Sequence, residues 1–172
     1  MRLANSITSD KRFYINPDDL NRIKKKKILF YRIKKIKIGN IKRYLNGNIF
    51  DLSKTDAYRL LENPNSIELQ KNYNYYCEKY CFEYENRSMN KFKSLTKNID
   101  KETYDPKKGI IIVDNLNIIS DGQHRACILL KKYGKNYKVK VLKIYCANLG
   151  VKTYIKCLIY SFKKIVNILK IK

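Results

Sequence analysis

The sequence predicts an α+β fold: a small mixed sheet with a β-β-α-β core, an added helical segment before it and a C-terminal amphipathic helix. Residues 110–113 are a short apolar run, and 117–120 return as a second strand after the turn-like stretch 114–117. Apolar residues then recur at helical spacing over residues 126–133, ahead of a glycine that can cap the helix. Residues 138–145 mix valine and isoleucine with lysine and predict a third strand.

The junction between the second strand and the helix is a candidate phosphate site. Gly122, Gln123, His124 and Arg125 open the predicted helix, and Asp121 precedes them. The first N–H groups of a helix have no internal partner, and the helix dipole places partial positive charge there. A glycine allows close approach to the backbone, and an arginine adds a forked cation, so the pattern suits a phosphate group. Asp121 can cap the helix, bind a metal or act as a base.

Residues 104–145 resemble the core of the ParB/sulfiredoxin superfamily. That family shows a strand, a turn, a strand ending in a Gly-x-[His/Arg]-Arg motif, a helix and a further strand. Gly122, His124 and Arg125 occupy the motif positions, and Asp121 matches the Asp-Gly-x-His-Arg version of the phosphotransferase branch. The resemblance implies a nucleotide-binding domain and, from that branch, an ATP-dependent kinase for a small-molecule hydroxyl. A glycan-precursor hydroxyl is a further expectation that comes from the basic ends of the chain, because such segments suit lipid-linked intermediates at a membrane.

The resemblance also implies roles for individual residues. The residues from Gly122 to Arg125 would hold the phosphates of ATP, with His124 donating a hydrogen bond. Asp121 would hold Mg²⁺ or orient the acceptor hydroxyl, because phosphoryl transfer needs mainly positioning and charge neutralisation. The kinase branch has a catalytic glutamate near the end of an early strand, and Asp56, or Asp51, is the nearest acidic counterpart here.

Other functions remain open at this point. Partition proteins of the family bind nucleic acid, so a nucleic-acid-binding protein or nuclease is an alternative, although too few residues follow the core for their downstream helix-turn-helix domain. A non-catalytic nucleotide sensor is another. Sulfinic acid reduction is disfavoured, because Gln123 stands where sulfiredoxins need a nucleophilic cysteine, and Cys127 lies on the packed side of the helix.

Positive charge is concentrated at the two ends of the chain. Lysine and arginine number 38 against 15 acids, which gives a net charge of +23. Residues 21–44 hold eleven basic residues and 151–172 hold six, with no acid in either segment, whereas 45–150 hold 18 basic and 12 acidic residues. We therefore expect a basic N-terminal segment (1–45), the nucleotide-binding domain (46–148) and a basic amphipathic helix (149–172).

The two basic segments allow several partners. Leu29, Ile33 and Ile36 lie among lysines at loosely helical spacing, which predicts a solvated basic helix, a membrane-surface helix or a nucleic-acid-binding arm. Over residues 151–172 an apolar stripe faces lysines, which suits packing on the domain or an anionic membrane surface. The first segment has no residue pattern that separates its three alternatives.

Helices are also predicted between the N-terminal segment and the core. A strand over 49–52 leads into Ser53, which with Asp56 three residues later resembles a capping box, and residues 63–65 end the helix that follows. A tyrosine-rich helical face covers residues 69–84 and is typical of core packing. Another helix is predicted from Arg87 to Ile99.

Cysteine usage and hydropathy predict a cytoplasmic protein. The five cysteines include no Cys-x-x-Cys pair, and there is one histidine, which argues against a zinc site and against a disulfide framework. No apolar run approaches the roughly 20 residues needed to span a bilayer, and the first residues are polar. The basic segments add peripheral association with the inner face of the membrane as an expectation.

Overall fold

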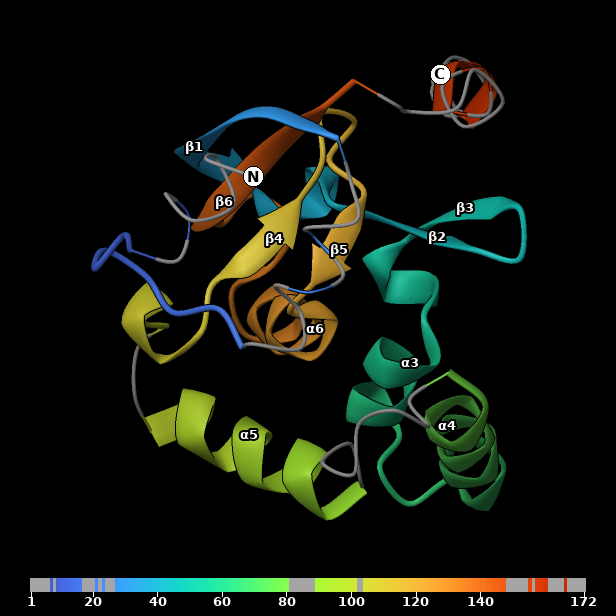
Figure 1. Ribbon diagram of the computed structural model, residues 1–172. Coiled ribbons are helices and arrows are strands. Elements are labelled where there is room, and N and C mark those ends of the chain that lie inside the picture. The colour runs from blue at the N-terminus through green and yellow to red at the C-terminus, as the bar shows by residue number, and fades with distance from the viewer. Residues whose placement is uncertain are drawn as a thin grey trace.

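The computed structural model describes residues 7, 9–16, 21, 23, 27–80, 89–101, 104–147, 155, 157–160 and 166. Within these residues the elements follow one another as β1 (Ile28–Lys37), η1 (Ile38–Asn40), β2 (Lys42–Leu45), β3 (Asn48–Asp51), η2 (Leu52–Lys54), α3 (Asp56–Glu62), α4 (Ile67–Tyr80), α5 (Met89–Lys101), η3 (Pro106–Lys108), β4 (Ile111–Val113), β5 (Ile119–Asp121), α6 (Gln123–Tyr133) and β6 (Lys138–Cys146). Figure 1 shows α6 against the sheet, with α3, α4 and α5 further out.

The main sheet has four strands in the order β1-β6-β4-β5. β1 pairs with β6 in antiparallel fashion, β6 with β4 in parallel, and β4 with β5 in antiparallel fashion. The sheet is therefore small and mixed, which confirms the predicted α+β class. The strands and the helix predicted between residues 110 and 145 are present, with boundaries shifted by one or two residues.

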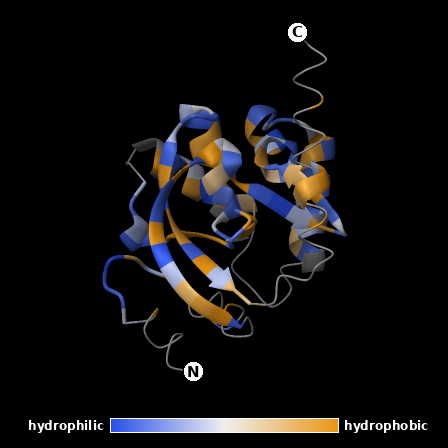
Figure 2. Ribbon diagram, turned by 90° about the horizontal axis from the view of Figure 1, so that it is seen from above, coloured by the Kyte–Doolittle hydropathy of each residue, from blue (hydrophilic) through white to orange (hydrophobic). Residues whose placement is uncertain are grey.

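The sheet is buried on both of its faces along β4. Ile111 and Val113 belong to a cluster that includes the inward side of α6, whereas Ile112 lies with Phe13 and Ile23 on the other face. This explains why β4 reads as a continuous apolar run rather than as an alternating one. Figure 2 shows that hydrophobic and hydrophilic residues alternate along the long strands of the sheet.

The predicted helical spacing of residues 21–44 is wrong for the part that the structure describes as β1 and β2. Tyr31 and Ile33 pack on one face of the sheet, and Ile36 packs on the other against the cluster that includes α6. In a helix Ile33 and Ile36 would share a face, but in a strand, positions three apart point to opposite faces. Pairing with β6 thus buries apolar residues of β1 on both faces of the sheet, whereas a helix would present them all on one side.

β2 and β3 form a separate two-stranded hairpin. Asn46 and Gly47 form its turn with φ values of 48° and 79°. Two successive positive φ angles fit the turn type whose twist matches that of paired strands, and Asn-Gly is its preferred sequence. The predicted turn and the predicted strand over residues 49–52 are therefore confirmed, and the register places Arg43 opposite Phe50.

Helix α3 begins two residues later than the predicted capping box implies. Thr55, not Ser53, is the N-cap residue, and its Oγ1 accepts a hydrogen bond from the backbone N–H of Tyr58 at 3.4 Å. Ser53 cannot cap the helix because it lies inside η2, so Asp56 is the first residue of α3 rather than its cap. The predicted end of this helix before Pro64 is confirmed.

Helix α4 packs against α3, and helix α5 packs against α6. In α4, Leu69 and Tyr73 are buried as predicted, while Tyr84 lies outside the described residues. In α5, Phe92 and Ile99 are buried, which confirms the predicted inward face. The C-terminal amphipathic helix lies largely outside the described residues: residues 155, 157–160 and 166 are helical. Among the described residues, no helix is long and apolar enough to cross a membrane.

Candidate functional site

The strand–helix junction has the backbone geometry of an open helix N-terminus. Gly122 is the N-cap residue of α6 in the left-handed conformation, with φ 80° and ψ 22°, and offers no side-chain cap. Its carbonyl accepts the first helical hydrogen bond, from the Ala126 N–H at 2.9 Å. A Cβ at this position would lie 3.0 Å from the Ile111 Cα, so both the φ angle and the packing on β4 require glycine.

The three residues that follow Gly122 point in three different directions. Successive side chains on a helix are separated by about 100°. Gln123 lines a pocket, His124 faces α4 and α5, and Arg125 faces back towards Asp121. The three side chains predicted to surround one phosphate therefore do not meet at one place. Only Gln123 is in the lining of the pocket.

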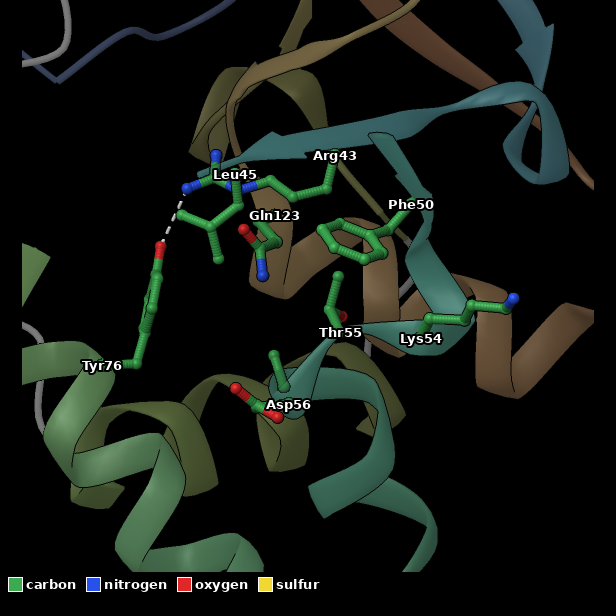
Figure 3. Close-up of a pocket in the computed structure, with 9 residues that line it drawn as sticks. Arg43, Leu45, Phe50, Lys54, Thr55, Asp56, Tyr76 and Gln123 are labelled. Carbon is green, nitrogen blue, oxygen red and sulfur yellow. Dashed lines mark hydrogen bonds between the residues drawn. The ribbon is translucent and has the colours of Figure 1, made fainter. Parts of the chain in front are cut away.

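The pocket has a volume of about 220 Å³ and lies between the β2–β3 hairpin and helices α3, α4 and α6 (Figure 3). Its lining combines cationic, acidic, hydroxyl and apolar groups: Arg43, Leu45, Phe50, Lys54, Thr55, Asp56, Ala57, Tyr76 and Gln123. Figure 3 shows Arg43 and Asp56 on opposite sides of Gln123. The structure therefore brings Asp56 and Gln123, two sequence-predicted site residues far apart in the chain, to one pocket.

Arg43 is a charged residue of the pocket that sequence reasoning missed. Its Nη2 donates a hydrogen bond to Tyr76 Oη at 3.0 Å. Its Nε is buried and has no hydrogen-bond acceptor within the part of the chain that the structure describes. In the sequence, Arg43 is one of eleven cations in a basic segment. The Asn46-Gly47 turn was the sequence signal that could have separated Arg43 from the other cations. A two-residue turn there pairs Arg43 with Phe50 in a hairpin.

Asp56 is the carboxylate of the pocket wall. It is the first residue of α3, and its Oδ1 lies 3.9 Å from Arg59 Nη1 in a loose ion pair. Its side chain is 40% exposed, so it can reach a bound molecule. Asp51, the other acidic candidate, hydrogen-bonds Tyr160 and contributes with burial to raising the pKa of that tyrosine; it is not in the pocket lining.

Behind the pocket lies a thiol that is not a nucleophile. Thr55 Oγ1 donates to the Leu52 carbonyl at 2.7 Å and lies 3.4 Å from Cys127 Sγ. Burial raises the pKa of Cys127 to about 12, because the thiolate would be desolvated. The reactive form of cysteine is the thiolate, so Cys127 stays an inert core group, as its predicted place on the packed side of the helix implied.

His124 is held by aromatic neighbours. Its Nε2 lies 3.0 Å from Tyr73 Oη, and its ring centroid lies 4.9 Å from that of Phe92. Tyr73 and Phe92 also stack on each other with centroids 5.2 Å apart. One ring nitrogen of His124 is thus engaged with α4, and the side chain fixes the first turn of α6 against α4 and α5.

Arg125 and Asp121 form a second polar cluster at the end of β5. Arg125 Nη1 lies 3.8 Å from Asp121 Oδ2. A Cβ on Gly109 would meet Arg125 Nη2 at 2.4 Å, so the guanidinium lies directly over this glycine. Tyr104 Oη nearby accepts from the Ile111 N–H at 3.0 Å and donates to the Lys140 carbonyl at 3.1 Å. Burial raises the pKa of Tyr104 to about 12.

Asp121 is thus paired with Arg125 and is absent from the lining of the pocket. No group of three or more His, Cys, Asp or Glu side chains is placed to hold a metal ion, as far as the described residues go. Comparisons of the chain with models of known families, with curated proteins and with solved structures give no match. What the site can do follows from its residues: it can hold an oxyanion near a helix N-terminus and bring a carboxylate to it.

Proposed function

We propose that the protein binds a nucleotide and transfers its terminal phosphoryl group to a hydroxyl compound. The observation that carries this proposal is the meeting of Gln123 and Asp56 in one pocket. Gln123 belongs to the first turn of a helix that has no side-chain cap. Asp56 supplies the carboxylate that the resemblance to the kinase branch of the ParB/sulfiredoxin superfamily calls for.

Binding of phosphate at the first turn of α6 follows from simple electrostatics. Gly122 lets a ligand approach the backbone, and the uncapped N–H groups and the dipole of α6 favour negative charge. Gln123 adds an amide donor, and Lys54 is a second cationic residue of the lining besides Arg43. The volume of about 220 Å³ is below the roughly 300 Å³ at which pockets for whole drug-sized ligands begin. The pocket therefore takes phosphate and acceptor groups, and the base and sugar lie outside it.

Asp56 is the group proposed to act on the acceptor. The acceptor oxygen forms a bond to the terminal phosphorus while the bond from that phosphorus to the bridging oxygen breaks. The hydroxyl proton passes to the Asp56 carboxylate, and the nucleoside diphosphate leaves. Such a transfer depends on alignment and charge neutralisation more than on covalent chemistry, which a pocket with a carboxylate facing cationic groups can provide.

ATP and Mg²⁺ belong to this proposal through the family resemblance. Mg²⁺ on a nucleotide is held by one or two protein carboxylates together with the phosphates. Asp121 ends β5 one residue before the N-cap of α6, but its carboxylate pairs with Arg125 and is absent from the lining of the pocket. It therefore does not fit as a ligand of an ion on phosphates held there, and the ion, which would neutralise phosphate charge, is assigned no protein ligand.

Substitution of Asp56 tests the transfer step. We expect Asp56→Asn to leave ATP affinity within about threefold and to lower phosphoryl transfer by about 10² or more, the range for loss of a general base. Transfer is measured with terminally labelled ATP over a panel of hydroxyl compounds. Glu62→Gln is the matched control, because Glu62 is an exposed carboxylate of the same helix outside the pocket. Full activity in Asp56→Asn would refute the role of Asp56.

A further inference from the structure

We infer that Arg43 and Tyr76 form an oxyanion receptor, and that the hydroxyl compound which accepts the phosphoryl group itself carries a carboxylate or a phosphate. The inference rests on the proposed function for the identity of the bound molecule as an acceptor. The receptor itself rests on the geometry of Arg43, to which neither sequence pattern nor family resemblance assigns a role.

The first observation is the buried Nε of Arg43. Buried N–H groups are almost always paired in native proteins, and an unpaired one on a charged group is costly. Arg43 Nε has no acceptor in the described part of the chain and belongs to a side chain that lines the pocket. A bound oxyanion supplies the missing acceptor, because the Nε and Nη edge of a guanidinium matches two oxygens of a carboxylate or phosphate.

The second observation is that contacts within the protein hold the guanidinium in place. Tyr76 Oη from α4 accepts from Nη2 at 3.0 Å, while the ladder of the β2–β3 hairpin fixes the backbone of Arg43 opposite Phe50. Leu45 and Phe50 give this end of the pocket an apolar wall (Figure 3). An apolar wall lowers the local dielectric constant and strengthens a charge-assisted hydrogen bond.

The third observation is the separation of opposite charges across the pocket. Arg43 and Asp56 lie on opposite sides of Gln123 (Figure 3). An anionic acceptor would be attracted to Arg43 and repelled by the Asp56 carboxylate. It would therefore bind with its anion at Arg43 and its hydroxyl towards Asp56. A neutral hydroxyl compound has no such preferred orientation.

Binding of matched small molecules tests this inference. Glycerol 3-phosphate, glycerate and glycerol share hydroxyl groups, and the first two add a phosphate or a carboxylate. Each is titrated calorimetrically into the full chain in the presence of Mg²⁺ and a saturating ATP analogue whose terminal phosphoryl group cannot be transferred, with orthophosphate as a probe of the receptor alone. We expect at least one of the anionic compounds to bind and glycerol to give no binding.

Variants then locate the anion. We expect Arg43→Gln to weaken anion binding about tenfold or more, the loss of one charge-assisted hydrogen bond. Arg43→Lys should recover part of the affinity, because lysine keeps the charge but not the fork. Tyr76→Phe should weaken binding, whereas Tyr75→Phe on the same helix should not, since Tyr75 is 60% exposed and outside the pocket lining. Arg32→Gln, at an exposed position of β1, controls for the loss of one charge.

The outcomes separate the two proposals. Unchanged anion affinity in both Arg43 variants, with their thermal melts intact, would overturn the receptor. Loss of ATP affinity in Arg43→Gln, with the anionic compounds competing against ATP, would show that Arg43 holds the nucleotide and would overturn the acceptor assignment. If the wild-type chain does not bind ATP but still binds orthophosphate through Arg43, the receptor stands and the proposed function falls.

Discussion

The register of β1 against β6 makes a quantitative prediction about charge. Lys35 lies directly opposite Lys140, and both side chains are exposed. Like charges in directly opposed positions of an antiparallel pair destabilise it. Lys35→Glu replaces this repulsion by an attraction, so we expect the substitution to raise the free energy of unfolding.

The size of the effect follows from Coulomb's law with screening. With the two charged groups about 7 Å apart in water, the interaction is about 0.6 kcal/mol before screening, and charge reversal changes it by twice that amount. Debye lengths of about 30, 8 and 3 Å then leave a gain of about 0.9 kcal/mol at 10 mM salt, about 0.5 at 150 mM and about 0.1 at 1 M.

Urea unfolding at these three salt concentrations measures the gain. Lys34→Glu is the matched control, because Lys34 is exposed on the same strand and carries the same charge but faces Val141. Its gain should be less than half as large. The double variant Lys35→Glu/Lys140→Glu restores like charges and should return to about the wild-type stability. An equal gain from Lys34→Glu and Lys35→Glu would refute the register and the reasoning.

Three further predictions concern the core of the site. Gly122→Ala should destabilise the fold by about 1–2 kcal/mol in urea unfolding, because alanine is strained at φ 80° and its Cβ would press on Ile111; a loss near zero would contradict this geometry. The pKa of Tyr104 is raised to about 12, so the neutral phenol stabilises the folded state fully below pH 10. This contribution to the free energy of unfolding is lost between about pH 10 and 12. Over that range Tyr104→Phe should lose less stability than the wild type does. Cys127 should react with iodoacetamide only after unfolding, whereas half-buried Cys77 reacts in the native state; mass spectrometry of the alkylated chain distinguishes them.

The core between β4 and β6 could be predicted because its signals are local. The buried run of β4, the turn that follows it and the glycines at both ends of α6 each act on neighbouring residues. β1 could not be predicted in this way. Its lysines suit a helix or a strand equally, and its strand conformation depends on pairing with β6, which lies about a hundred residues later in the chain.

The candidate site was predictable only in part, for the same reason. Gly122 and the start of α6 follow from the sequence, but the direction of each side chain depends on what packs around the helix. Arg43 joins Gln123 only because the β2–β3 hairpin docks beside α6, and no local pattern encodes that docking. Asp56 was chosen by its distance from a predicted strand, and the structure places it in the pocket although its expected capping role was wrong.

Calorimetric titration of ATP with Mg²⁺ into the wild type and Gln123→Ala tests the central claim most directly. The substitution is neutral, so the net charge stays at +23 and non-specific attraction of ATP to a basic protein is the same in both. At 150 mM salt we expect one saturable site in the wild type and a loss of about threefold to tenfold in affinity for the variant, the value of one hydrogen bond to a charged group. The same affinity in both proteins, or no saturable binding in the wild type, would contradict the assignment of this pocket to nucleotide phosphate.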